Sequence, residues 1–197
     1  MSIRHASEED VNNGATTIPD VPDAPTIGAA TNVGTSRAYN NGSATVAYTA
    51  AATGGTPTTF TATSTPGSFT GTGVSPITVT GLQSATSYTF TVTPSNSTGT
   101  GPASSASSSI TATSVPQAPT IGTATLSAAT VTIPFTAGAT GGQTITAYTV
   151  TSSSGLTGTA SSSPITITET VTGTYTYTVT ATNTNGVSVL VAVTVYV

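Results

Sequence analysis

Cysteine and tryptophan are absent from this sequence of 197 residues, and charged side chains are scarce. Without cysteine no disulfide can form. Charged residues make up 4% of the chain, against about 25% in ordinary globular proteins. A body with so few Lys and Arg residues lacks the cationic cluster that neutralises phosphates, so we expect no binding to nucleic acid. No run of about 18 apolar residues is present, so we also expect no segment that spans a membrane.

The few charges gather at the start of the chain. Residues 1–20 carry a net charge of −3 and the remaining residues one of −1, which sum to −4. We interpret residues 1–20 as a charged N-terminal arm that attaches the chain to a partner; the alternative is a solvated tail. This end is acidic and lacks the apolar core of a secretory signal, so we do not expect it to direct secretion. The candidate partner-binding residues of the arm are Arg4, His5, Glu8, Glu9 and Asp10.

The side chains that most enzymes use are nearly missing. The single histidine, His5, lies in the arm, and the only acids after residue 20 are Asp23 and Glu169, well apart in the sequence. Neither a carboxylate pair nor a Ser–His dyad can therefore form in the body, and we expect no enzyme activity and no cofactor. The His and acids of the arm share one short turn, which makes a poor metal site. Asp20 and Asp23 supply too few oxygens for calcium.

Threonine is the residue that the sequence has in excess. The 50 threonines make up about a quarter of the chain. Because Thr is β-branched and suits half-exposed pleated surfaces, this composition favours an all-β protein with thin cores. In residues 81–103, Tyr88, Phe90 and Val92 alternate with threonines, which predicts a strand with one apolar face. A weaker copy of this stretch returns at residues 173–186.

An internal repeat divides the chain. Residues 21–28 recur at residues 115–122, at an offset of 94 residues, and a repeat of this length is a whole domain. We predict an arm at residues 1–20 and two tandem antiparallel β-sandwiches at residues 21–114 and 115–197, built from short alternating strands. The linker between them, Ser114 to Pro119, is short and holds two prolines, which favours an end-to-end rod.

The alternation also predicts which side chains face inward. Each predicted domain has enough apolar positions for one small core. In the first these are Ile27, Val46, Tyr48, Phe60, Ile77, Val79, Leu82, Tyr88, Phe90, Val92 and Ile110. In the second they are Ile121, Ile133, Phe135, Tyr148, Val150, Ile165, Ile167, Val171, Tyr175, Tyr177 and Val179.

The first repeat resembles the fibronectin type III domains of bacterial and bacteriophage proteins. Its Gly81–Leu82 turn precedes Tyr88, which matches the tyrosine-corner position of that family. Tyr48 stands where the family usually has Trp. The closing turn of the family is matched by Asn96, Gly99, Gly101 and Pro102.

The second repeat departs from this pattern. It lacks the Gly–Leu turn, and its copy of the strand is closer to an immunoglobulin-like F strand, with Tyr177 at the usual Cys position. Pro134 lies within a predicted inner strand, where it removes a donor from the ladder, so we expect a bulge there or a looser immunoglobulin-like domain. The resemblance as a whole implies an all-β fold of tandem sandwiches over residues 21–197.

The resemblance also implies a structural role, because such repeats are common additions to the virion proteins of tailed bacteriophages. We expect a non-enzymatic structural or display protein of the virion, either a capsid decoration or a tail or fibre appendage. Its arm would bind a capsid or tail protein. The alternative is an extracellular bacterial adhesion or carbohydrate-associated module, with a cell-surface glycan as its partner. Self-association into a filament is a further alternative.

The last predicted strand, residues 187–197, is apolar on both faces. Its odd-numbered valines, which include Val187, Val189 and Val197, supply one face for the core. The other face carries Leu190, Ala192 and Tyr196 in place of hydroxyls. A strand that is apolar on both faces is usually covered on both, so we predict that Leu190 and Tyr196 contact a neighbouring chain. The alternative is that both simply lie at the surface. We predict a last strand in the first domain at residues 107–113.

Overall fold

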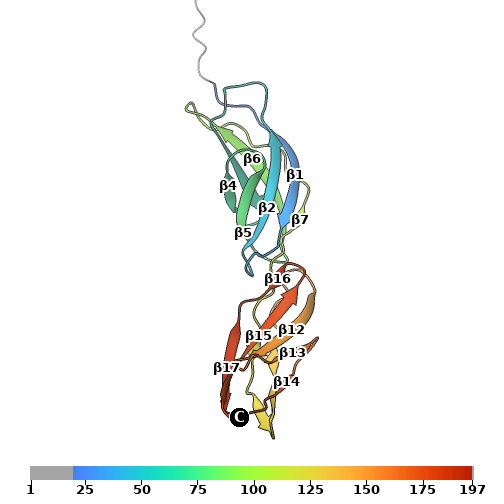
Figure 1. The fold of residues 1–197 in the computed structure, drawn as a ribbon. Coiled ribbons are helices and arrows are strands. Elements are labelled where there is room, and N and C mark those ends of the chain that lie inside the picture. The colour runs from blue at the N-terminus through green and yellow to red at the C-terminus, as the bar shows by residue number, and fades with distance from the viewer. Residues whose placement is uncertain (1–19, 197) are drawn as a thin grey trace, which may run out of the picture.

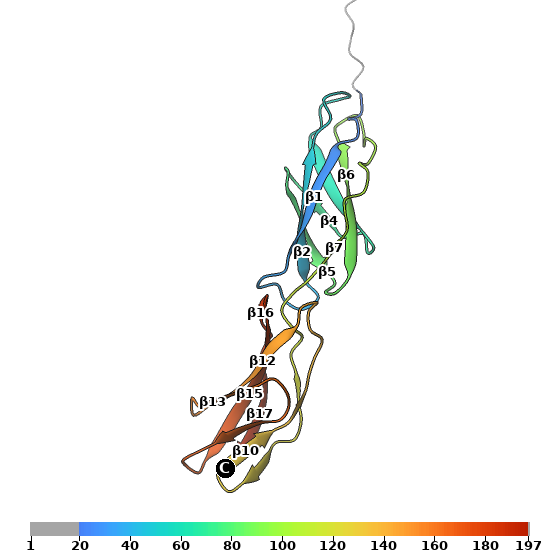
Figure 2. The same cartoon turned by 90° about the vertical axis from the view of Figure 1, so that its right-hand side faces the viewer.

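The computed structural model describes residues 20–196. These residues form two β-sandwiches that lie end to end, and no helix is found among them (Figures 1 and 2). The predicted all-β class with tandem antiparallel sandwiches is confirmed. The arm residues Arg4, His5, Glu8, Glu9 and Asp10, and Val197 at the other end, lie outside the described residues.

The first sandwich packs a three-stranded sheet, β1-β2-β5, on a four-stranded sheet, β4-β3-β6-β7. All pairings within both sheets are antiparallel. The strands are β1 (Thr26–Val33), β2 (Gly42–Thr49), β3 (Thr59–Thr65), β4 (Thr70–Thr72), β5 (Ile77–Leu82), β6 (Ser87–Ser95) and β7 (Ile110–Thr111).

The second sandwich repeats this plan with shorter and more broken strands. One layer holds the sheet β14-β10-β9 and the two-stranded pair β11-β8, and the other holds β13-β12-β15-β16 with β17 also paired to β15. The strands are β8 (Thr120–Ile121), β9 (Thr125–Ser127), β10 (Thr130–Ile133), β11 (Phe135–Thr136), β12 (Ile145–Ser152), β13 (Thr157–Ala160), β14 (Ile165–Thr168), β15 (Thr174–Asn183), β16 (Gly186–Val187) and β17 (Val191–Tyr196).

Each sandwich has its own hydrophobic core, and most of the predicted inward positions are confirmed. Tyr88, Phe90 and Val92 are buried in the first core, and Tyr177 and Val179 are buried in the second. Val131 and several alanines also belong to the cores, although the sequence pattern did not single them out. Each core therefore combines small alanines with large aromatic side chains, as close packing of a thin sandwich requires.

Three valines predicted to face a core are instead exposed. Val171 is 66% exposed because the inward alternation of Ile165 and Ile167 continues to Glu169, and the chain then turns away. Val187 and Val189 are 54% and 69% exposed. Here Ser188 is the residue that turns inward, and the alternation changes phase before β17 begins.

Pro134 divides its strand in two, as a residue without a backbone donor does. β10 ends at Ile133 and pairs with β9 and β14, whereas β11 begins at Phe135 and pairs with β8. The Phe135 N–H donates to Ser163 Oγ at 2.8 Å. The equivalent N–H of the first sandwich, that of Tyr48, donates to Ser75 Oγ at 2.9 Å. The predicted irregularity is therefore a switch between sheets.

Serine hydroxyls replace part of the ladder beside β6 and β15. The N–H groups of Val92, Phe90 and Ala181 donate to the hydroxyls of Ser104, Ser107 and Ser188 at 2.9–3.0 Å. Each serine hydroxyl donates in turn to the carbonyl of the next residue. The predicted strand at residues 107–113 is consequently reduced to β7, because Ser104 and Ser107 bond β6 through one backbone N–H and one hydroxyl each instead of a regular ladder.

The linker between the sandwiches is hydrogen-bonded to both. The Val115 N–H donates to the Arg37 carbonyl at 2.9 Å. The side-chain amides of Asn183 and Asn185 both donate to the Ser114 carbonyl, at 2.9 and 3.0 Å. The end-to-end arrangement in Figures 1 and 2 therefore rests on direct bonds as well as on a short connection.

A glycine lets the two sandwiches approach this closely. A Cβ atom at Gly34 would lie 2.0 Å from Thr113 Oγ1 and 2.9 Å from Asn185 Nδ2, which only glycine avoids. Two residues on, the Ser36 N–H donates to the Asn185 carbonyl at 2.7 Å. The loop after β1 is thus bonded directly to the second sandwich.

Candidate docking surface

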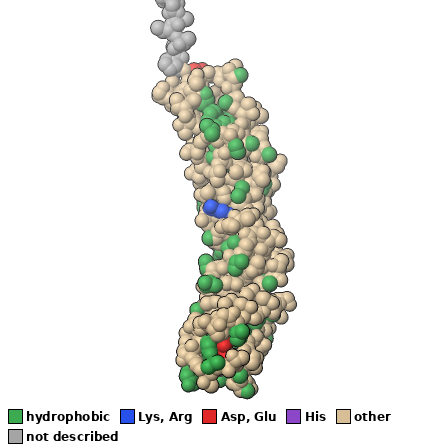
Figure 3. Space-filling model, in the orientation of Figure 1, with side chains coloured by type: hydrophobic (Ala, Val, Ile, Leu, Met, Phe, Trp, Pro, Cys, Tyr) green, Lys and Arg blue, Asp and Glu red, His purple; other side chains and the backbone are tan. Residues whose placement is uncertain are grey.

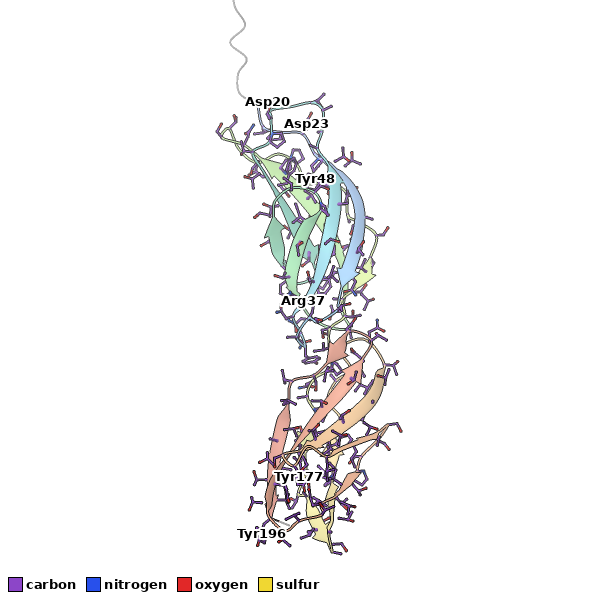
Figure 4. All side chains as sticks on the ribbon, in the orientation of Figure 1. Asp20, Asp23, Arg37, Tyr48, Tyr177 and Tyr196 are labelled. Carbon is purple, nitrogen blue, oxygen red and sulfur yellow. The ribbon has the colours of Figure 1, made fainter. Side chains whose placement is uncertain are left out.

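The two predicted contact residues of the last strand lie at the surface, but not together. Leu190 is 68% exposed and Tyr196 is 74% exposed. Leu190 precedes β17 and Tyr196 ends it, so the length of the strand, about 20 Å at 3.3 Å per residue, separates them. Figure 4 places Tyr196 at the end of the second sandwich far from the junction. One partner patch cannot be built from these two side chains alone.

Leu190 comes directly after the valines of an apolar surface at the junction of the two sandwiches. Val187 and Val189, next to it in the sequence, are also exposed. Two adjoining hollows of about 290 and about 250 Å³ lie here, and both are lined by Ala38, Val115 and Val189. We call the set Ala38, Val115, Val187, Val189 and Leu190 the junction surface. It draws residues from both sandwiches and from the linker.

Arg37 lies at this junction (Figure 4). Its side chain donates to Asn41, through Nε to the carbonyl at 2.9 Å and through Nη2 to Oδ1 at 3.2 Å. The junction surface is therefore apolar with one cation beside it, a composition typical of protein contact surfaces.

The second candidate is a carboxylate that the sequence pattern did not mark as a site. Glu169 is only 3% exposed. Its Oε1 accepts hydrogen bonds from three hydroxyls, those of Ser152 at 2.5 Å, Tyr177 at 3.0 Å and Ser154 at 3.3 Å. In the sequence, Glu169 occupies the next position in the inward alternation that Ile165 and Ile167 begin, and this position indicates that its side chain is buried.

These contacts decide the ionisation of the group. Burial raises the pKa of Glu169, while the hydrogen bonds from Ser152, Ser154 and Tyr177 lower it, and the net shift is downward. The carboxylate is therefore charged at neutral pH. Burial, and then the hydrogen bond to Glu169, raise the pKa of Tyr177 to about 12, so the phenol keeps its proton. The arrangement is a network in which three hydroxyls donate to one charged carboxylate oxygen.

A third hollow, of about 370 Å³, lies beside Tyr48 on the first sandwich. The Tyr48 ring packs against Phe60 with centroids 4.4 Å apart, and its hydroxyl donates to the Gly73 carbonyl at 3.0 Å. Pro57 and the 85%-exposed Val74 complete an apolar rim among threonine hydroxyls. Tyr48 thus takes the place that the resemblance gives to Trp, but with its ring partly open to solvent.

Asp20 and Asp23 have local structural roles at the far end of the first sandwich (Figure 4). Asp20 Oδ1 accepts from the Val21 N–H at 2.8 Å, and Asp23 Oδ2 accepts from Thr53 Oγ1 at 2.6 Å. Within residues 20–196 no group of three or more His, Cys, Asp or Glu side chains could hold a metal ion. In the same part of the chain, no helix is long and apolar enough to cross a membrane.

Comparison with known proteins bears on the fold alone. No protein-family model and no curated protein matches the chain. Among solved structures, the chain is similar to the crystal structure of the chicken CNTN1 FN1–FN3 domains, with a TM-score of 0.47 and 14% sequence identity. The similarity covers 89% of this chain and 66% of that chain. The sheets themselves define the class as a tandem of antiparallel β-sandwiches.

Proposed function

We propose that the chain is a non-enzymatic structural or display protein of a bacteriophage particle, as a capsid decoration or as a tail or fibre appendage. The observation that carries this proposal is the contrast between a bonded, nearly neutral rod and a charged arm. Residues 21–197 carry a net charge of −1, whereas the first 20 residues carry −3. The arm is the part that electrostatic attraction would bring to a basic partner surface.

The junction surface supplies a second point of contact in this proposal. Exposed apolar surface that draws on two domains is typical of sites where proteins meet. The hydrogen bonds of Asn183 and Asn185 to the linker hold the two halves of this surface in one arrangement. A capsid or tail protein would therefore meet a preformed surface, which lowers the entropy cost of binding.

The alternative function, an extracellular adhesion or carbohydrate-associated module, draws on the hollow beside Tyr48. An aromatic ring partly open to solvent among threonine hydroxyls offers both an apolar face and hydrogen-bonding groups. Sugars present the same two kinds of surface. In this alternative the partner is a cell-surface glycan and the location is extracellular.

An antibody raised against the purified chain separates the two functions. Electron microscopy of immunogold-labelled particles and of cell surfaces from the source culture shows where the protein is. Regular labelling of virus particles at many copies supports the proposal. Labelling of the cell envelope with bare particles contradicts it and favours adhesion.

The arm is tested by a deletion of residues 1–19, which keeps Asp20, whose carbonyl accepts from Asn96 Nδ2 at 2.8 Å. The truncated chain is expected to fold and to lose attachment to particles stripped of the native protein. Attachment of the full chain is expected to weaken at high salt. Leu190→Ser serves as the matched variant for the junction surface. Full occupancy by the truncated chain would show that the arm is not the anchor.

A further inference from the structure

Glu169 is a buried charge without a countercharge. It is the only charged side chain in residues 115–197, and only 3% of its surface is exposed to solvent. A carboxylate in such a position is usually paired with a cation, because burial of an isolated charge is costly. Here three hydroxyl donors take that place on one oxygen.

The other oxygen of the same carboxylate is free of these bonds. All three recorded hydrogen bonds end on Oε1. No side-chain oxygen of the described residues is both buried and without a partner, so Oε2 reaches solvent. Glu169 lines a hollow of about 260 Å³ together with Ala128, Ala129 and residues 170–172. The other side chains of this lining belong to alanine, threonine and valine, each of which carries a methyl group.

The surface view agrees with this geometry. In Figure 3 a small area of acidic side chain is visible on the lower half of the molecule, with hydrophobic side chains around it. Glu169 is the only acid in residues 115–197, and its Oε2, which reaches solvent, is open to a ligand from outside.

We infer that this hollow binds an alkylammonium group, specifically the side chain of a lysine presented by a partner protein. The ammonium would bond Oε2, and its alkyl stem would lie along Ala128, Ala129 and Val171. Lysine fits better than arginine because a guanidinium fork prefers two free oxygens of one carboxylate, and Oε1 is already occupied. This inference is independent of the proposed function, since a lysine of any protein partner would serve.

The test uses the whole chain with two pentapeptides, acetyl-Ala-Ala-Lys-Ala-Ala-amide and the same peptide with norleucine in place of lysine. NMR spectra of the backbone amides follow each titration. The lysine peptide is expected to shift the signals of residues 128–129 and 170–172 saturably. The norleucine peptide, and an arginine peptide of the same form, are expected to bind about tenfold more weakly, the loss of one hydrogen bond to a charged group.

Glu169→Gln keeps an oxygen for the three hydroxyls and removes the charge. It is expected to weaken binding of the lysine peptide about tenfold. Val171→Lys provides a second test at an exposed position, where folding is not at risk. Its ammonium should occupy the hollow and block the peptide, whereas Val33→Lys, the same exchange at an exposed valine of the first sandwich, should not. Equal binding of the lysine and norleucine peptides, or equal binding by Val171→Lys and Val33→Lys, would overturn the inference.

Discussion

The same corner of the two sandwiches is filled in opposite ways. The segments Ser75–Thr80 and Ser163–Thr168 share the pattern Ser-Pro-Ile-Thr-x-Thr, so the residues that follow them, Gly81 and Glu169, are equivalent. In the first sandwich Gly81 adopts φ +81°, and the next residue, Leu82, is fully buried. In the second sandwich the carboxylate of Glu169 takes the inward place.

The neighbours of this corner differ accordingly. Ser64 and Ser152 are equivalent and both are buried. The Ser64 hydroxyl bonds only the backbone of its own hairpin, at Pro66 and Phe69, whereas the Ser152 hydroxyl donates to Glu169. The residue Phe90 of β6 becomes Tyr177 in β15, and the added hydroxyl also donates to Glu169.

The comparison teaches that one scaffold tolerates either an apolar plug or a polar network at a core position. The polar version requires that the carboxylate and the tyrosine occur together, because the serine is present in both sandwiches. A carboxylate opposite Phe90 would lack the tyrosine donor, and a tyrosine opposite Leu82 would bury a hydroxyl without an acceptor. Each of those half-changes would cost more than the complete exchange.

The largest expected effect comes from Tyr88→Ala in the apolar corner. This change removes a buried ring that packs against Phe69 with centroids 6.1 Å apart. We expect the first sandwich to lose about 3–5 kcal/mol of stability and to unfold or nearly unfold. Chemical denaturation of the whole chain, with NMR signals from each sandwich, measures it. Tyr196→Ala, at an exposed tyrosine, is the control, and equal losses from both variants would contradict the core assignment of Tyr88.

The next effect comes from exchanging the two equivalent aromatic residues. Tyr177→Phe leaves Glu169 with one donor fewer, and we expect a loss of about 1.5–3 kcal/mol in the second sandwich, the value of a hydrogen bond to a charged group. Phe90→Tyr buries a hydroxyl in the first core and should cost about 1–3 kcal/mol. Denaturation midpoints at constant m-value measure both. A neutral Tyr177→Phe would mean that the network adds no stability.

A smaller effect is expected from Tyr88→Phe. The Tyr88 hydroxyl accepts the N–H of Gln83 at 2.9 Å, which is the tyrosine-corner bond that the resemblance implied. Loss of this bond alone should cost about 0.5–1.5 kcal/mol. In the second sandwich the equivalent Tyr175 hydroxyl donates to the Val171 carbonyl at 2.8 Å, and Tyr175→Phe should cost a similar amount. Unchanged melting of both variants would show that the corner bonds contribute nothing.

The smallest expected effect is a loss of stability of the second sandwich at acidic pH. The folded-state pKa of Glu169 lies below its ordinary value of 4.5, so its contribution to stability is present above pH 4.5 and is lost as pH falls through the folded pKa. The opposing effects of burial and hydrogen bonding keep the net shift modest. The second sandwich should therefore weaken below pH 4.5 more than the first, whose described acids are exposed. Glu169→Gln should remove the difference, and its persistence in that variant would place the cause elsewhere.

The strands could be predicted because side chains of a strand point alternately to the two faces of its sheet, so Thr alternates with apolar residues where one face is buried. The pattern located β6 and β15 and most of both cores. It failed at Val171 and Val187, where a turn and an inward serine change the phase of the alternation. Phase changes of this kind depend on hydrogen bonds made by side chains, which periodicity does not record.

The sites were harder to predict than the strands. The sequence predicts Leu190 and Tyr196 as apolar residues outside the core, and both are exposed. Only the folded structure shows that β17 separates them and that Val189, next to Leu190, lies with Val115 and Ala38. Glu169 stood out as a lone acid in the sequence. Its three hydroxyl donors come from β12, the following turn and β15, and only the folded chain brings these together.

The serine hydroxyls beside β6 and β15 also affect how readily the neighbouring backbone could pair with another chain. Strands at the edges of sheets tend to pair with other chains, and proteins commonly prevent this with charged residues such as Lys. This chain contains almost none. Instead, the hydroxyls of Ser104, Ser107 and Ser188 donate to the carbonyls of Ser105, Ser108 and Val189, so those acceptors are already engaged. In a protein poor in charge, this bonding removes three acceptors with which a strand of another chain could otherwise pair.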